Sequence, residues 1–164
     1  MQQTSVSKIA AVIALAFVLA GGSAFAKRLS HRTSAFAKDD YVVTTKLMPR
    51  AEHGDANAQA RLGFMYEHGR GVAQDYVTAV YWYTAAAAQG HPSGQYLLGL
   101  MYDKGHGVAR SATLAYMWLN LAAAHAPPRT QAYYSRIRDA IAAKLSPDQV
   151  AAAQWQAAAA LPGL

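Results

Sequence analysis

The chain has 164 residues, carries no cysteine and has a formal net charge of +6 at pH 7. The lack of cysteine excludes disulfide staples, thiolate metal sites and anchoring through a lipidated cysteine. The basic residues form no Lys/Arg run, so they indicate a solvated basic surface, suited to an acidic partner or an anionic polymer rather than to nucleic acid.

Residues 1–26 have the pattern of a cleavable export signal. Lys8 supplies the positive start, an apolar run follows from Ile9 to Ala20, and Ala24 and Ala26 place small side chains at a cleavage site. The competing interpretation is an uncleaved membrane anchor, which needs about 20 apolar residues. The apolar run is shorter than that. We therefore expect cleavage after Ala26 and a periplasmic or secreted protein.

Two further segments precede the regular part of the chain. Residues 27–40 are first basic and then acidic, with few large apolar side chains, which predicts a flexible leader. Residues 41–54 are expected to form a degenerate half-repeat that caps the N-terminal end, because Gly54 lies 36 positions before Gly90, a predicted helix stop. Pro49 should interrupt this helix, since it lacks the amide hydrogen.

The centre of the chain repeats itself at a constant spacing of 36 residues. The matched pairs are Leu62/Leu98, Gly63/Gly99, Tyr66/Tyr102, Gly69/Gly105, Gly71/Gly107, Val72/Val108, Ala79/Ala115, Trp82/Trp118 and Ala86/Ala122. A repeat of this length predicts a helical solenoid, whose units stack because one unit alone cannot bury its apolar stripe. Full repeats are expected at about 55–90 and 91–126.

Each unit is expected to contain two helices. The first helices are predicted at 58–68 and 93–104, where Gly63 allows close approach of a neighbouring helix and Gly69 ends the helix in a left-handed conformation. Asp75 is the candidate N-cap of the second helix in the first unit.

The second helices carry the large aromatic residues. Ser111 takes the N-cap position in the second unit, as Asp75 does in the first. Trp82 and Trp118 recur at the repeat spacing, which predicts that both rings pack in the core.

Capping helices are expected over 129–160, after the helix-breaking pair Pro127-Pro128. Ser146 and Gln149 form a capping box with Pro147 at the first helical position, which marks the start of the last helix. The helix before it has one apolar face: Tyr134, Ile137, Ile141 and Leu145.

The residues matched between the two units resemble the signature of the Sel-1-like repeat (SLR) family, a relative of the tetratricopeptide repeats. The second unit departs from it at Ser111, where Asp is usual, and at Leu121, where Ala is usual. The resemblance implies an all-α fold, a right-handed α/α solenoid of helix pairs with C-terminal capping helices. It also implies an adaptor or scaffold function. The tail is similar to the C-terminal helices of small secreted members.

No catalytic, cofactor-binding or metal site is predicted. The six histidines include no pair at the i, i+4 spacing of a zinc helix, and no G-x-S-x-G motif is present. Glu67 and Asp103 are 36 residues apart, so they belong to the repeat rather than to a catalytic pair. We therefore expect a protein that is not an enzyme and uses no cofactor.

A partner-binding face is predicted on the first helices, which by resemblance line the inner curve of the solenoid. Positions that differ between equivalent sites need not pack alike, as at Arg61/Leu97 and Phe64/Leu100. The candidate residues are Arg61, Phe64, Met65, Tyr96, Leu100 and Met101.

These features together predict an exported protein–protein interaction module, acting as an adaptor, scaffold or regulator of the bacterial cell envelope. The expected partner is another envelope protein, with no nucleic acid and no membrane span after signal cleavage. Two alternatives stay open. The first is binding of envelope glycan or peptidoglycan fragments, and the second, less favoured, is a hydrolase.

Overall fold

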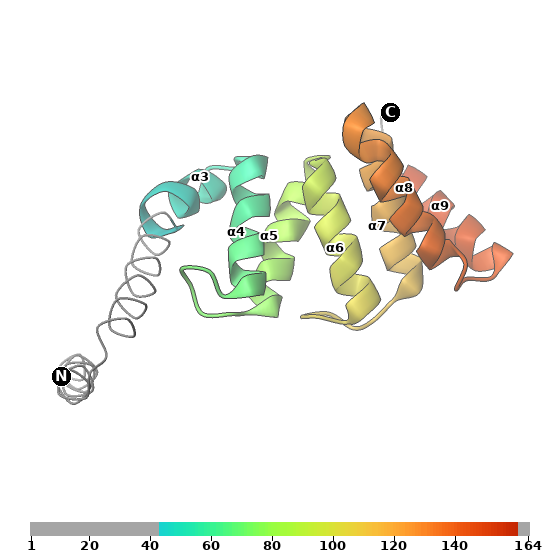
Figure 1. The fold of residues 1–164 in the computed structure, drawn as a ribbon, viewed down its shortest axis with the longest axis horizontal. Helices are drawn as coiled ribbons and strands as arrows, with labels where there is room; N and C mark the ends of the chain where they lie inside the picture. The colour runs from blue at the N-terminus through green and yellow to red at the C-terminus, as the bar shows by residue number, and fades with distance from the viewer. Residues whose placement is uncertain (1–42, 161–164) are drawn as a thin grey trace, which may run out of the picture. The chain divides into compact units, whose positions relative to one another are not determined.

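The computed structural model describes residues 43–160, so the predicted export signal (1–26) and leader (27–40) lie outside the described residues. The described part contains helices and no strand: η1 (Val43–Leu47), α3 (Met48–Glu52), α4 (Ala56–His68), α5 (Tyr76–Ala88), α6 (Pro92–Lys104), α7 (Ala112–His125), α8 (Pro128–Ala142) and α9 (Pro147–Ala160) (Figure 1). Over this range, every helix is too short or too polar to cross a bilayer.

The helices stack in pairs. α4 packs on α5, α5 on α6 and α6 on α7, while α7 contacts both α8 and α9. α4 also contacts α6 directly, and α6 and α8 lie nearer the viewer than α7 and α9 in Figure 1. α4, α6 and α8 are therefore the first helices of successive units, and α5 and α7 are the second helices.

The two full units begin and end their helices with the same local interactions. Asp75 Oδ1 accepts from the N–H groups of Val77 and Thr78, and Ser111 Oγ accepts from Leu114 N–H at 3.3 Å. Both predicted N-caps are thus confirmed. The left-handed C-caps of α4 and α6 are the glycines Gly69 (φ +63°) and Gly105 (φ +74°).

The segment before the first unit is interrupted near the predicted proline. The π-helix η1 passes into the short α-helix α3 at Met48, and Pro49 lies in the first turn of α3. Proline has no N–H to donate to the preceding turn, so a regular hydrogen-bond ladder cannot continue through this position, and the helix type changes there.

Glycine sets the distance between the two helices of each pair. A Cβ on Gly63 would lie 2.6 Å from Cδ1 of Tyr83, and a Cβ on Gly99 would lie 2.9 Å from Cγ of Leu119. Both distances are shorter than real Cβ contacts allow. The predicted close approach at Gly63 is confirmed, and its partner is the ring of Tyr83.

The core of the first pair is centred on Tyr83 rather than on Trp82. Tyr83 is fully buried, and Leu119 is fully buried at the equivalent position. Trp82 and Trp118 pack against the margins of the buried clusters and stay partly exposed. One helical residue is a rotation of about 100°, so a side chain next to a buried position lies at the edge of the buried face. The prediction of core packing therefore holds only in part for the tryptophans.

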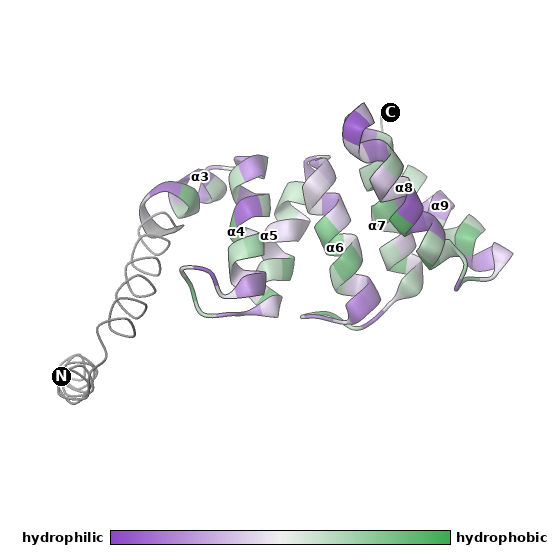
Figure 2. Ribbon diagram, in the orientation of Figure 1, coloured by the Kyte–Doolittle hydropathy of each residue, from purple (hydrophilic) through white to green (hydrophobic). Residues whose placement is uncertain are grey.

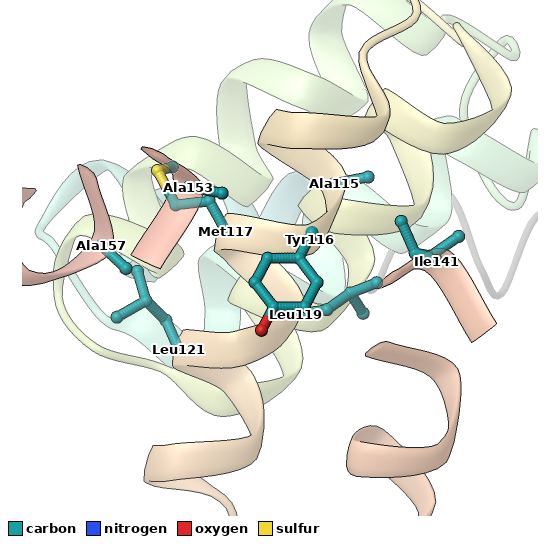
Figure 3. Packing of buried hydrophobic residues seen from close by; sticks show 8 residues of the cluster. All are labelled: Ala115, Tyr116, Met117, Leu119, Leu121, Ile141, Ala153 and Ala157. Atoms are coloured by element: carbon teal, nitrogen blue, oxygen red, sulfur yellow. The ribbon is translucent and has the colours of Figure 1, made fainter. Parts of the chain in front are cut away.

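The last helix, α9, packs against α7. Ser146 N–H donates to Gln149 Oε1 at 2.9 Å and Gln149 N–H donates to Ser146 Oγ at 3.2 Å, which confirms the capping box. Figure 3 shows Ala153 of α9 against Met117 and Ala157 against Leu121, within one buried cluster. Small residues on α9 let this helix approach α7 closely.

Candidate partner-binding face

The structure divides the predicted site residues into two groups. Met65 and Met101 are buried, with 7% and 0% of their surface exposed, so the prediction that they belong to a binding face is corrected. They lie three residues after Leu62 and Leu98, on the same buried side of each helix. Four predicted residues keep surface exposed: Arg61, Phe64, Tyr96 and Leu100.

The exposed residues of the first helices follow one stripe. Asn57, Arg61, Phe64 and His68 are three or four residues apart on α4, and the equivalent positions on α6 and α8 lie 36 and 72 residues later. All of them keep some surface exposed. The first-helix face, as used below, consists of Asn57, Arg61, Phe64, His68, Ser93, Tyr96, Leu97, Leu100, Lys104, Arg129, Tyr133, Arg136 and Ala140.

A group of tyrosines joins α6 to α8 at this face. The rings of Tyr96 and Tyr134 are stacked, with centroids 4.5 Å apart and planes 12° apart, and the hydroxyls of Tyr96 and Tyr133 are 3.0 Å apart. Burial, together with the hydrogen bond to Tyr133, raises the pKa of Tyr96 above its ordinary value. Tyr133 remains 51% exposed. Its contact with Tyr96 holds this exposed ring in place.

The first-helix face carries positive charge that no carboxylate of the described residues pairs with. Arg61, Lys104, Arg129 and Arg136 make no ion pair or side-chain hydrogen bond with any described residue, and the face contains no Asp or Glu. α5 and α7 have no charged Asp, Glu, Lys or Arg at all. In Figure 2 the hydrophilic residues gather instead on α4, α8 and the ends of α6.

The carboxylates near this face are already engaged. Glu67 Oε2 accepts from the Tyr83 hydroxyl at 2.7 Å, and Asp103 pairs with Lys144 at 3.3 Å. Asp55 caps α4, where the backbone N–H of Ala58 and then the Arg50 guanidinium lower the pKa of its carboxyl. These acids therefore leave the arginines of the face unpaired.

A buried amide network, which the sequence interpretation missed, links the units behind this face. Gln95 is fully buried, donates from Nε2 to the carbonyl of Ala87 at 3.2 Å and accepts from His125 Nδ1 at 2.9 Å. Gln59 makes the same contacts 36 residues earlier, with Ala51 and Gln89. The sequence contains a sign of this network, since Gln59 and Gln95 are a further matched pair at the repeat spacing.

Four histidines of the described segment, His53, His68, His91 and His125, have a ring nitrogen within hydrogen-bond distance of a structural partner, whereas the buried Nδ1 of His106 has none among the described residues. His91 Nδ1 accepts from Gly94 N–H at 3.1 Å and caps α6, while its Nε2 lies 3.0 Å from Asn57 Oδ1. Burial lowers the pKa of His91, and the charge of Asp55 opposes that effect in part. Over residues 43–160, no three His, Asp or Glu side chains lie together in a way that could hold a metal ion.

The repeats match a known family. The family model described as the Sel1 repeat matches residues 56–91 and 92–126. No curated protein matches the chain.

Two solved structures are similar to this chain. One is c5321, described as a protective antigen present in uropathogenic Escherichia coli strains and displaying an SLR fold, with 28% identity and a TM-score of 0.65 over 70% of this chain. The other is a Sel1 repeat protein from Oxalobacter formigenes, with 38% identity and a TM-score of 0.54 over 57% of this chain. The matches span 24% and 27% of those two proteins.

The helix pairs, the glycine contacts and the exposed stripe define an α/α solenoid, a class of repeat protein whose surfaces serve binding. The chain contains two Sel1 repeats. The predicted family is therefore confirmed, as is the predicted all-α, right-handed solenoid with C-terminal capping helices. Sel1-repeat proteins typically mediate protein–protein interactions.

Proposed function

We propose that this protein is an exported adaptor, scaffold or regulator of a bacterial cell envelope and that it binds another protein through the first-helix face. The observation that carries this proposal is that the basic side chains of this face have no ion-pair partner among the described residues. α4 and α8 present arginines that have no partner among the described residues, and α8 also presents the half-exposed ring of Tyr133, although the core needs neither. Repeat proteins bind through such continuous surfaces, because one partner can contact several units at once.

Binding rather than catalysis is the proposed mode of action. Two polar groups that could serve as an acid or a base already have structural partners: Glu67 accepts from the Tyr83 hydroxyl, and His91 accepts from Gly94 N–H. The envelope location rests on the export pattern of residues 1–26.

A second candidate function is binding of glycan or peptidoglycan fragments. The exposed ring of Tyr133 favours it, because aromatic faces offer a flat apolar surface to a sugar ring. We rank it second, since the same face carries three guanidinium groups, those of Arg61, Arg129 and Arg136.

Affinity capture from envelope extracts tests the proposal. The bait is the chain from Lys27 onward, compared with a face variant, Arg61→Glu with Tyr133→Asp, and a matched control, Arg70→Glu with Tyr81→Asp. Arg70 and Tyr81 are exposed but lie outside the first-helix face. We expect a stoichiometric protein partner on the wild type and the control and none on the face variant. Retention of glycan without protein, or turnover of a substrate by the bait alone, would contradict the proposal.

A further inference from the structure

We propose that the first-helix face recognises an acidic peptide segment of its protein partner, in which carboxylates flank apolar side chains. This inference rests on the proposed function and adds the chemistry of the partner. Three features of the face support it: its free arginines, the distance between them and the apolar side chains around them.

α8 carries two arginines that are free to bind carboxylates. Arg129 and Arg136 are exposed and have no partner among the described residues, and the first-helix face offers them no carboxylate. Asp139, the acidic residue of α8, pairs with its neighbour Arg138 at 2.8 Å. A guanidinium binds a carboxylate with two parallel hydrogen bonds, so two free arginines are suited to two carboxylates of a partner.

The two arginines of α8 are spaced to match a short peptide. Arg129, Tyr133 and Arg136 stand at i, i+4 and i+7, so they lie on one side of α8. Seven residues of helix extend about 10 Å. A peptide in the polyproline II conformation advances about 9 Å in three residues, which is one full turn, so side chains three positions apart lie on the same side. Carboxylates three positions apart can therefore reach both arginines at once.

Exposed apolar side chains between and beside the arginines favour a peptide over a uniform polyanion. Tyr133 lies between the two arginines, and Leu97, Leu100 and Phe64 keep partly exposed apolar surface on the neighbouring helices. A polymer held by charge alone gains nothing from these side chains. A peptide with apolar residues between its acids would bury them against this surface and release the water there.

Fluorescence anisotropy with defined peptides tests this inference. The probe is a labelled synthetic peptide in which two leucines stand between two glutamates, within a Gly/Ser background. One comparison peptide has lysine in place of glutamate, and another has serine in place of leucine. We expect the Glu/Leu peptide to bind at least about tenfold more tightly than either, because both charge and apolar burial are needed.

Matched charge variants locate the site. Arg129→Glu with Arg136→Glu changes the net charge by −4, and so does Lys46→Glu with Arg70→Glu, whose side chains are exposed outside the first-helix face. The first pair should weaken the Glu/Leu peptide at least about tenfold, and the second pair should change it by no more than about twofold. Circular dichroism on both variants verifies that the helices remain.

Several outcomes would overturn the inference. Equal binding of the Glu/Leu peptide, the Glu/Ser peptide and dextran sulfate would make the face a site for polyanions. Equal losses in both charge variants would reduce the effect to net charge. Failure of the Glu/Leu peptide to bind, while the captured partner still depends on Arg61 and Tyr133, would refute the acidic peptide and leave the proposed function standing. If the wild-type chain captured no protein partner, the proposed function itself would be refuted.

Discussion

His125, at the end of α7, hydrogen-bonds the buried side chain of Gln95 on α6, with His125 Nδ1 2.9 Å from Gln95 Oε1. The amide nitrogen of Gln95 donates to the carbonyl of Ala87, so its oxygen is the acceptor and His125 must carry a proton on Nδ1. One side chain thereby ties three successive helices together.

The first prediction concerns this contact. Gln95→Leu should lower the free energy of unfolding by about 1–3 kcal/mol, because the Ala87 carbonyl and His125 Nδ1 would lose their buried partner. Gln131 occupies the equivalent position on α8 and is exposed, so Gln131→Leu is the matched control and should change stability by no more than about 0.5 kcal/mol. Urea unfolding of the three proteins measures both effects, and equal losses would contradict the assigned role of Gln95.

The second prediction separates neighbouring aromatic residues of α5. Tyr83→Ala should cost about 3–5 kcal/mol, because it removes a fully buried ring and leaves a cavity. Trp82→Ala should cost clearly less, since Trp82 is only partly buried. Thermal and urea unfolding give the order. A larger loss for Trp82→Ala would mean that the tryptophan, and not the tyrosine, organises the pair.

The third prediction is a pH dependence at His91. Its pKa in the folded protein lies below the ordinary value of 6.5, mainly through burial, so the unfolded chain binds the proton more readily. This contribution to stability is therefore complete above about pH 6.5 and is lost as the pH falls toward the folded pKa. Protonation at Nδ1 also removes the acceptor for Gly94 N–H.

His91→Asp provides the comparison for that prediction. Aspartate is the cap at the equivalent position of α4, Asp55, and it stays ionised through this range. Urea unfolding at about pH 7.5 and 5.5 should show a loss for the wild type and a smaller loss for His91→Asp, since the other histidines titrate in both proteins. Identical losses in the two proteins would exclude His91 as the source.

The fourth prediction concerns export. Protein recovered from the envelope of an expressing bacterium should begin at Lys27, because signal cleavage follows small side chains such as Ala24 and Ala26. Intact mass spectrometry measures this directly, with Ala24→Leu and Ala26→Leu as a variant that should block cleavage. A mass that begins at Met1 in the wild type would support the uncleaved anchor instead.

Much of the fold follows from the sequence because its determinants are local. A cap needs one short polar side chain next to free amides, and a left-handed turn needs glycine, so Asp75, Ser111 and Gly69 could be assigned from their positions alone. The capping box at Ser146 and Gln149 is equally local. The repeat of 36 residues then predicts stacking, since each helix pair has an apolar side to bury.

Only the tertiary structure decided which side chains each helix turns toward its neighbours. A rotation of one residue exchanges Trp82 for Tyr83 in the core, and residue type does not set that rotation. Met65 and Met101 are a matched pair at the repeat spacing, and the structure buries both because they share a helix side with Leu62 and Leu98. Both methionines therefore belong to the core rather than to a binding face.

The candidate face likewise depends on both the sequence and the tertiary structure. Arg61, Phe64, Tyr96 and Leu100 could be proposed from the sequence because they differ between equivalent positions, and their role as partner contacts stays a prediction. The pairing of charges depends on contacts between residues far apart in the chain, such as Lys144 with Asp103. Folding brings those acids to other partners and leaves the arginines of the first-helix face free, because side-chain pairing is decided by distance in space rather than along the sequence.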